Sequence, residues 1–474
     1  MTTNFGGTAA QHDALLSRLD NLEPGRPHRR LMMMGGLGYT FDSFDGALMG
    51  YALSALIVIW AIPASVSGWL LSSIFFGYLV GALVAGVLAD RFGRRKLLMT
   101  ALLIFCACSL LMGTAGSVPE LFIWRALAGV GIGAETALIA PYISEFLPAR
   151  VRGKFVTRTV GFLAFGYILA GVAAPIIISP NPEIGWRIAA VVAALPVLLL
   201  LWWRRSLPES PRYLLSKGRV DEATAVIEDI ERRSGVDPLM PASLAVEPAP
   251  PVGGDVLEAP RSVARRSALS QLLALWKGPL ARTTAVIWLL WFIFTGVNYG
   301  FSAWLPSLLV IEKGLTLTNS FLVALITSVA QLPGYYVASL LIDKIERKWL
   351  LAIYALGATA GALVVAFAEH TWVLVLGSAV LAAFANGAAG IYYTYTAELY
   401  PTAVRATAMG VASAVGRVGA IAAPIVIGYL FARVGWVNVF LALVVALAVA
   451  VAVVVIFGER TSGRSLNEDV PRVA

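Results

Sequence analysis

Charged residues are scarce in this chain. Only 14% of its 474 residues are Asp, Glu, Lys or Arg, while 58% are hydrophobic and the mean hydropathy is +0.78. Soluble globular proteins carry about 25% charged and about 45–50% apolar residues. The composition excludes a soluble enzyme, a disordered regulator and an ordinary nucleic-acid-binding protein, and it indicates a membrane protein. The net charge of +8 then reflects basic loops at one membrane face rather than an affinity for nucleic acid.

Residues for redox, metal or nucleotide chemistry are few as well. Cys106 and Cys108 lie two residues apart in an apolar run, and a helix directs residues at this spacing to different faces. Neither a disulfide nor a metal site is therefore expected. The chain has three histidines and no Gly-Lys-Ser or Gly-Lys-Thr phosphate loop, which argues against a metal centre and against ATP-driven transport. We expect no catalytic site, no cofactor and no metal.

A cleavable signal peptide is also missing. The first 30 residues are polar and contain no short apolar core followed by a small-residue cleavage site. The first apolar run is then expected to act as an uncleaved insertion signal, which leaves residues 1–30 as a cytoplasmic tail.

Long apolar runs are abundant. A membrane-crossing helix needs about 20 mostly apolar residues, and twelve runs meet this requirement, so we predict an all-α membrane protein with twelve transmembrane helices. They form an N-terminal half at 31–203 and a C-terminal half at 283–457, with a polar central loop at 204–282 and a tail at 458–474. The predicted spans are 31–60, 68–89, 97–115, 119–142, 154–178, 187–203, 283–308, 318–342, 349–368, 372–396, 406–431 and 437–457.

Basic residues are distributed unevenly between the two sides of these spans. Most of the 36 lysines and arginines fall in the N-terminal tail, the central loop and the loops and tail on the same side, whereas Arg187, Lys313 and Arg433 lie on the other side. Cytoplasmic loops carry such an excess. We expect a multi-pass protein of the inner (plasma) membrane with both termini in the cytoplasm.

The two halves repeat each other at a constant offset. GALVAGVLADRFGRRKLL at 81–98 is matched by GYYVASLLIDKIERKWLL at 334–351, 253 residues later. The motif Glu-x-x-Pro-x-x-x-Arg at 145–152 recurs at 398–405 with the same offset. Each half is therefore predicted to be a six-helix unit, repeated in parallel, and such repeats place a substrate site between the halves near the middle of the bilayer.

These motifs carry a family resemblance. The segment 81–95, with Gly81, Asp90 and Arg94 in place, resembles the signature loop of the major facilitator superfamily, and the resemblance covers nearly the whole chain. It implies a secondary transporter whose two six-helix halves rock around one central site.

Local resemblances point to two kinds of substrate. PYISEFLPARVRG at 141–153 and PESPR at 208–212 resemble sugar-porter motifs, although the sugar-porter Gln pair of span five, Gly-Pro-x-x-Trp element of span ten and Pro-Glu-Thr ending are missing. The motif Asp-x-x-Asp-x-x-x-x-Gly at 42–50 and AELYPTAVRATAMG at 397–410 resemble the aromatic-acid:proton symporters.

Four ionisable residues inside spans are candidates for proton coupling, because such groups are costly in a membrane. Asp42 and Asp45 lie on one helical face; at least one, with Asp45 favoured, is expected to gain and lose a proton, or else both cap a broken helix or hold a salt bridge. The resemblance implies that Arg125 pairs with Asp45, either as a couple that separates on protonation or as a permanent ion pair. Glu135 is either a second titrating group or a substrate contact.

Arg417 in span eleven is the main candidate for substrate recognition. Its planar guanidinium suits a carboxylate, so it is expected to select organic anions if it faces the cavity; alternatively it neutralises Glu135 or Asp45. Further polar and aromatic residues of spans seven, eight and ten are candidate pocket residues: Trp291, Asn298, Tyr299, Gln331, Asn386, Tyr392 and Tyr393. Asn298 occupies the repeat position of Asp45.

Charged motifs at the cytoplasmic helix ends are interpreted as gates. Ion pairs there can latch the halves in an outward-open state and, as a network, bias a two-state equilibrium, whereas topology signals alone would explain the arginines but not the acids. The residues concerned are Asp90, Arg94, Glu145, Arg152, Asp343, Arg347, Glu398 and Arg405.

The leading hypothesis is a monomeric secondary active transporter that imports a small organic carboxylate, possibly aromatic, together with protons by alternating access. Its partners are then the small-molecule substrate, protons and the lipid bilayer, and no nucleic acid. A sugar or polyol porter, and a proton-coupled exporter of drugs or metabolites, are the alternatives.

Overall fold

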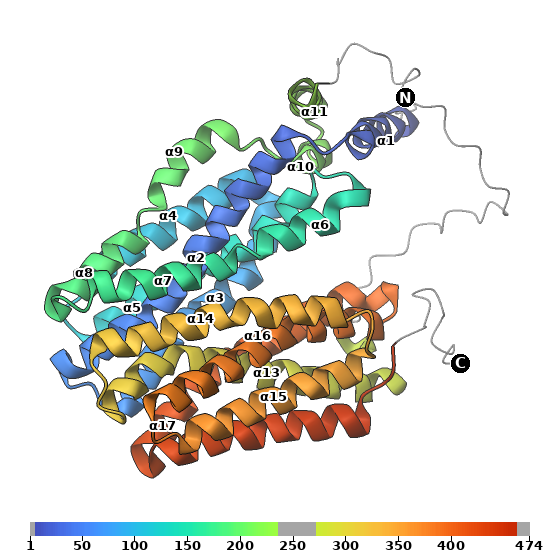
Figure 1. The fold of residues 1–474 in the computed structure, drawn as a ribbon. Coiled ribbons are helices and arrows are strands. Elements are labelled where there is room, and N and C mark those ends of the chain that lie inside the picture. Colours follow the sequence, from blue (N-terminus) through green and yellow to red (C-terminus); the bar gives the residue numbers. More distant parts are fainter. Residues whose placement is uncertain (1–4, 236–271, 462–474) are drawn as a thin grey trace.

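The computed structural model describes residues 5–235 and 272–461, and within these ranges the chain forms helices and no strand. Residues 236–271 of the predicted central loop and most of the predicted C-terminal tail lie outside the described residues. The helices form two bundles that lie side by side (Figure 1). The first contains α1 (Phe5–Asn21), α2 (Arg26–Trp60), α3 (Ala64–Phe92), α4 (Arg94–Met112), α5 (Val118–Ser144), α6 (Ala149–Val160), α7 (Leu163–Ile177), α8 (Pro182–Ala193), α9 (Val197–Ser206), α10 (Pro211–Ser216) and α11 (Val220–Ser234). The second contains α13 (Pro279–Ile311), α14 (Leu317–Leu341), α15 (Arg347–Phe367), α16 (Thr371–Leu399) and α17 (Thr402–Phe457).

The predicted fold class of twelve membrane spans is confirmed. Eleven helical segments of the described ranges are long and apolar enough to cross a membrane, with α6 and α7 joined into one and α8 and α9 into another. The last, in α17, is 54 residues long, which is more than twice what one crossing needs. Its helical backbone is interrupted at Gly435, whose φ of 73° is a conformation that glycine adopts at little cost. This interruption divides α17 into the eleventh and twelfth spans.

The repeat seen in the sequence is reproduced in the helix boundaries. Helices α2 to α6 begin at residues 26, 64, 94, 118 and 149, and α13 to α17 begin at 279, 317, 347, 371 and 402, so every start is displaced by the same 253 positions. Equivalent residues of the two repeats also meet. The hydroxyls of Ser54 and Ser307 lie 3.3 Å apart, and Gly50 lies against the backbone of Ala303. The approximate twofold axis of the molecule therefore passes between α2 and α13.

The halves contact each other from the middle of the bundle to one end, called here the opposite end because it lies away from α1, α10 and α11 (Figure 1). Gly68 in α3 lies against the backbone of Pro424 in α17, and Gly428 lies against Ala64. Because glycine has no side chain, the two helices approach closely. The end that holds α1, α10 and α11 is called the terminal end, and the ion pairs observed there each lie within one half.

Gly68→Val is expected to force the halves apart at the opposite end. A Cβ at Gly68 would lie 2.5 Å from the carbonyl oxygen of Pro424, which is too close for any side chain. A cysteine placed at Ser307, which is fully buried here, should then react about tenfold faster with a membrane-impermeant maleimide, the factor that corresponds to a shift of about 1.4 kcal/mol. The native Cys106 and Cys108 are buried and give little background.

The matched control for this prediction is Gly86→Val in the same helix. Nothing lies within 4 Å of a Cβ at Gly86, so labelling of the cysteine at Ser307 should stay at its original rate. If the cysteine at Ser307 is labelled at the same rate with and without Gly68→Val, the contact between Gly68 and Pro424 does not hold the opposite end closed.

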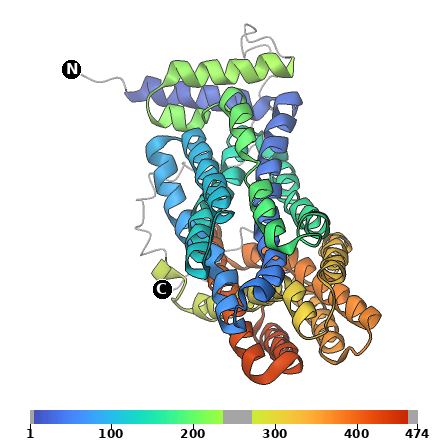
Figure 2. The same ribbon diagram turned by 90° about the vertical axis from the view of Figure 1, so that its left-hand side faces the viewer.

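The terminal end of the N-terminal half carries a small helical layer. The predicted polar tail of residues 1–30 contains α1, which lies alongside α11 of the central loop (Figure 2). Leu15 and Leu19 of α1 are buried, one turn apart, and Arg18 forms an ion pair with Glu231 of α11. The hydrogen bond from Arg18 to this carboxylate raises the pKa of the guanidinium above its ordinary value.

Candidate functional site

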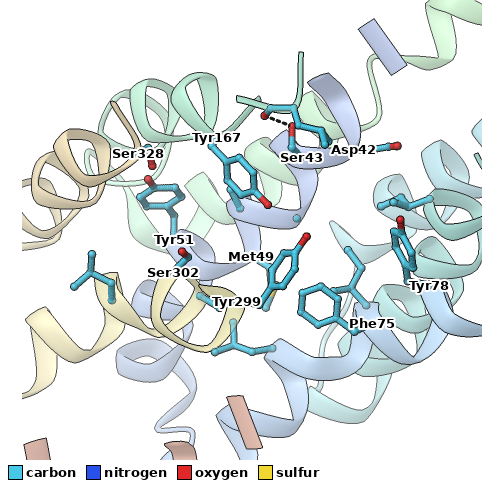
Figure 3. A pocket seen from close by; sticks show the side chains of 18 of the residues that line it. Asp42, Ser43, Met49, Tyr51, Phe75, Tyr78, Tyr167, Tyr299, Ser302 and Ser328 are labelled. Carbon is cyan, nitrogen blue, oxygen red and sulfur yellow. Dashed lines mark hydrogen bonds between the residues drawn. The ribbon is translucent and has the colours of Figure 1, made fainter. Parts of the chain in front are cut away.

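A cavity of about 120 Å³ lies between the halves, near the middle of the bundle. Its wall combines side chains of four helices of the N-terminal half and three of the C-terminal half, and Figure 3 shows the hydroxyls of Tyr167 and Tyr299, one from each half, pointing toward each other. The polar or aromatic wall residues of the N-terminal half are Asp42, Ser43, Tyr51, Phe75, Tyr78, Thr136 and Tyr167. Those of the C-terminal half are Tyr299, Ser302, Thr327, Ser328, Gln331 and Arg417.

Arg417 projects from α17 into the cavity, between tyrosines of both halves. Its Nη2 donates to the Tyr78 hydroxyl at 2.9 Å and its Nη1 to the Tyr299 hydroxyl at 3.3 Å. The guanidinium carbon lies 4.0 Å from the centre of the Tyr78 ring, which is a cation–π distance. Among the described residues, no carboxylate lies within ion-pair distance of Arg417. The cation is therefore positioned by neutral groups and keeps its charge available to a ligand.

The ring of Tyr299 also forms an aromatic wall of the cavity. It meets Phe75 of the other half edge to face, with ring centres 4.8 Å apart. Tyr167 of α7 lines the same cavity (Figure 3). A flat, apolar ring can stack against such walls while its polar substituent reaches the arginine.

Asp45 and Arg125 form a buried ion pair next to the cavity. Arg125 Nη1 lies 2.6 Å from Asp45 Oδ2, and both side chains are at most 1% exposed. Ser109 donates a hydrogen bond to the other carboxylate oxygen. The pairing implied by the family resemblance is thus present, and it explains why Arg417 is free of Asp45. The role of the pair in proton coupling stays a prediction.

Asp42 lies one turn before Asp45 and lines the cavity. Its Oδ2 accepts a hydrogen bond of 2.9 Å from the Thr136 hydroxyl, whereas its Oδ1 has no partner although it is buried. An unsatisfied carboxylate oxygen in a buried place is costly. Asp42 therefore has a free acceptor that a proton or a ligand can engage.

Glu135, the residue before Thr136, is fully buried and does not line the cavity. Neither of its carboxylate oxygens has a hydrogen-bond partner. Its side chain occupies the space that Gly38 of α2 leaves open, with Oε1 2.5 Å from where a Cβ at Gly38 would lie. In this conformation Glu135 is therefore a buried acid rather than a wall residue of the cavity.

Five of the predicted pocket residues do not line this cavity. Trp291 and Tyr392 are buried inside the C-terminal half, where their rings pack at 4.8 Å between centres, and Trp291 donates to Thr396. Trp291 and Tyr392 therefore fill the contact between α13 and α16. The five are Trp291, Asn298, Asn386, Tyr392 and Tyr393, and any contact that they make with substrate stays a prediction.

Several wall residues were missed from the sequence, notably Tyr78 and Tyr167. Each is the single tyrosine of its predicted span, and its hydroxyl in an apolar run was the available signal. Which face of such a span points inward is not encoded in its hydropathy, because both faces are apolar.

The predicted gate residues lie at the terminal end in two equivalent clusters. Arg94 contacts Asp90 at 2.9 Å and Glu145 at 3.4 Å, and the same fork recurs in the other half between Arg347 and the carboxylates of Asp343 and Glu398. Arg152 and Arg405, also one repeat apart, each donate to the backbone carbonyl five residues earlier. Whether these clusters gate transport stays a prediction.

The sugar-porter-like motif at 208–212 has a structural role at the same end. Glu209 Oε1 accepts hydrogen bonds from the backbone amides of Arg94 and Arg95 at the start of α4. Ser210 caps α10 by accepting from the amide of Tyr213. A carboxylate at a helix N-terminus is stabilising, so this motif fastens the central loop to the N-terminal half and does not touch the cavity.

Two repeated six-helix bundles around a central cavity, with an ion pair buried in the membrane interior, define a membrane transporter of the major facilitator fold. The chain belongs to the sugar (and other) transporter family of the major facilitator superfamily, whose model matches residues 38–470. It is a transporter and not an enzyme.

Relatives extend over almost the whole length. The chain is 36% identical to the niacin transporter NiaP of Acinetobacter baylyi over 95% of this chain and 98% of the relative. It is 29% identical to the benzoate transport protein of the same organism, with 85% and 83% of the two chains covered. In fold it is similar to the xylose transporter XylE from E. coli in an inward-open conformation, with a TM-score of 0.72, 20% identity, and 93% and 98% of the chains covered.

Proposed function

We propose that this transporter imports a small aromatic monocarboxylate together with protons. The observation that carries the proposal is Arg417, a cation in the cavity between the halves that is held by tyrosine hydroxyls and, within the described ranges, by no acid. Arginine matches a carboxylate with two parallel hydrogen bonds. The ring of the substrate then packs against Phe75 and Tyr299. The names of relatives that transport niacin and benzoate, both aromatic acids, agree with this chemistry.

Proton coupling is assigned to Asp45 and Arg125. A protonated Asp45 no longer neutralises Arg125, so binding or release of one proton changes the electrostatics of a buried pair beside the substrate. Because the pair lies on α2 and α5, the change acts within the N-terminal half, while Arg417 senses the substrate from the C-terminal half. The hydrogen bond from Arg417 to Tyr78 joins the substrate-sensing residue to the half of the molecule that holds the ion pair.

The conformation supports alternating access. The halves meet from the cavity to the opposite end, and the gate clusters at the terminal end pair within each half rather than across the halves. With the termini in the cytoplasm, this arrangement is the inward-facing state. In the outward-facing state the contacts at Gly68 and Ser54 separate and the clusters at the terminal end approach each other.

A sugar is less well accommodated. Sugars are neutral and carry no group that matches the charge of Arg417, which lies between aromatic rings in the cavity wall. The sugar-porter-like motif at 208–212 serves as a helix cap at the terminal end and gives no support to a sugar substrate.

Uptake into proteoliposomes tests the proposal. With an imposed inward proton gradient, labelled nicotinate or benzoate should accumulate, a protonophore should abolish the accumulation, and hexoses and polyols should not accumulate. Gradient-independent equilibration of a sugar would contradict the proposal, as would protonophore-insensitive uptake of the acids. Liposomes without protein correct for diffusion of the neutral acids through lipid.

A further inference from the structure

Glu135 is the one membrane-buried acid of the N-terminal half that neither pairs with a cation nor lines the cavity. It is 0% exposed and both carboxylate oxygens lack a hydrogen-bond partner. An ionised carboxylate without partners in an apolar interior costs far more free energy than a neutral carboxylic acid. In the conformation described here the group is therefore the neutral acid, with a proton bound.

In the part of the chain that the structure describes, no cation faces Glu135. Helix α2 presents Tyr39 and Asp42, and α4 presents Cys106, as the ionisable groups that act on Glu135. Helix α9 contributes the indole of Trp203, packed at the same place beside Gly38. Arg125, ten residues earlier in the same helix, is about 15 Å away along the helix axis and is engaged by Asp45. Each ionisable group that faces Glu135 is thus neutral or acidic, and none of them favours a permanent negative charge.

The repeat shows that the fold does not require an acid here. The residue 253 positions later is Ala388, which is fully buried in the equivalent contact of α16. The repeat positions of Asp42 and Arg125 are likewise neutral, Thr295 and Ser378. An acid retained at such a cost in one half and absent from the other indicates a role outside packing.

A route for the proton leads to the cavity through Asp42. Asp42 lies one helical turn after Gly38, the residue against which Glu135 packs, and it accepts from Thr136, the residue after Glu135. Asp42 is also the acid that acts electrostatically on Glu135, and its own Oδ1 is unpartnered at the cavity wall. The two carboxyls therefore stand in series between the cavity and the buried position.

We propose that Glu135 is a second proton-carrying site, loaded and unloaded through Asp42, so that two protons accompany each substrate molecule. This inference rests on the proposed function. One proton on Asp45 together with a monocarboxylate anion moves no net charge across the membrane. A second proton on Glu135 adds one positive charge per cycle, so that transport becomes electrogenic and responds to membrane potential.

A membrane potential imposed without a pH gradient tests this inference. With a potassium diffusion potential set by valinomycin, an inside-negative potential of about 59 mV should drive about tenfold accumulation of nicotinate by the unmodified protein, the factor for one net charge per cycle. Glu135→Gln, which resembles the protonated acid in shape and charge, should show no potential-driven accumulation, although a pH gradient still drives uptake through Asp45. Glu135→Asp should retain the response to potential.

Controls separate this inference from the proposed function. Glu120→Gln removes a half-buried acid from the first turn of the same helix, where it accepts from the Gly116 amide, and should keep the tenfold response. Counterflow exchange shows that Glu135→Gln is folded and binds substrate. Accumulation driven by membrane potential in Glu135→Gln would overturn the inference alone. The same holds if the unmodified protein shows pH-driven uptake but no response to membrane potential. Failure of pH-driven uptake of acids by the unmodified protein would instead overturn the proposed function.

Discussion

Asp45→Asn is expected to abolish proton-driven accumulation of the substrate while exchange of labelled for unlabelled substrate continues at a reduced rate. Asparagine cannot bind a proton, so the state of Arg125 no longer changes during the cycle. Exchange needs only the substrate-loaded protein to alternate, and Arg417 and the tyrosines that hold it are untouched. Uptake and counterflow in the same proteoliposome preparation provide the two readouts.

The same substitution has an expected cost in stability. Arg125 is 1% exposed, and removal of its partner leaves an uncompensated charge in the interior, which costs about 3–5 kcal/mol. The double variant Asp45→Asn, Arg125→Gln should recover much of the lost thermal stability and still fail to accumulate substrate. Glu183→Gln, at an exposed acid in the first turn of α8, is the control for loss of one charge. Accumulation by Asp45→Asn at the original level would remove Asp45 from the coupling role.

Arg417→Gln is expected to weaken binding of aromatic acids by about 2–5 kcal/mol, roughly 30-fold or more in Kd. The loss comes from the charge-assisted hydrogen bonds to the carboxylate. The neutral amides of the same acids bind without that contribution, so their affinity should change little. Binding is measured by tryptophan fluorescence or by calorimetry on the purified protein.

Two further variants define the origin of the effect. Arg417→Lys keeps the charge but loses the planar fork and most of the stacking on Tyr78, so it should bind acids with intermediate affinity. Arg433→Gln removes an exposed arginine of the same half and should bind acids normally. Equal losses for acids and amides in Arg417→Gln would exclude carboxylate recognition by this residue.

Most of the fold could be predicted from the sequence because membrane spans and their repeat leave signals that need no knowledge of packing. The offset found between two short motifs also describes the starts of five pairs of helices. The helix α1 was not predicted. Its leucines at 15 and 19 have helical spacing, but only docking against α11 makes a short polar segment a stable helix.

The candidate site could be predicted only where charge made residues conspicuous. Arg125, Asp45 and Arg417 are rare residue types in a membrane span, and the structure places the first two in contact and the third in the cavity. Of the aromatic candidates, only some line the cavity. Tyr299 lines the cavity, whereas Tyr392 and Trp291 pack inside the C-terminal half. The rotation of each apolar helix about its own axis decides this, and it depends on contacts between helices that are distant in sequence.

The constant offset between the halves also bears on how such a protein changes over evolution. Two copies of one ancestral unit, joined in tandem, have diverged in sequence. The repeat positions equivalent to the acids at 42, 45 and 135 are Thr295, Asn298 and Ala388, and the position equivalent to the cation at 417 is Ala164. If energy conversion resides in one copy and ligand selection in the other, mutations can accumulate in the second copy without loss of the driving force. Chimaeras that exchange only the C-terminal copy between relatives then inherit the donor's substrate and the recipient's dependence on protons.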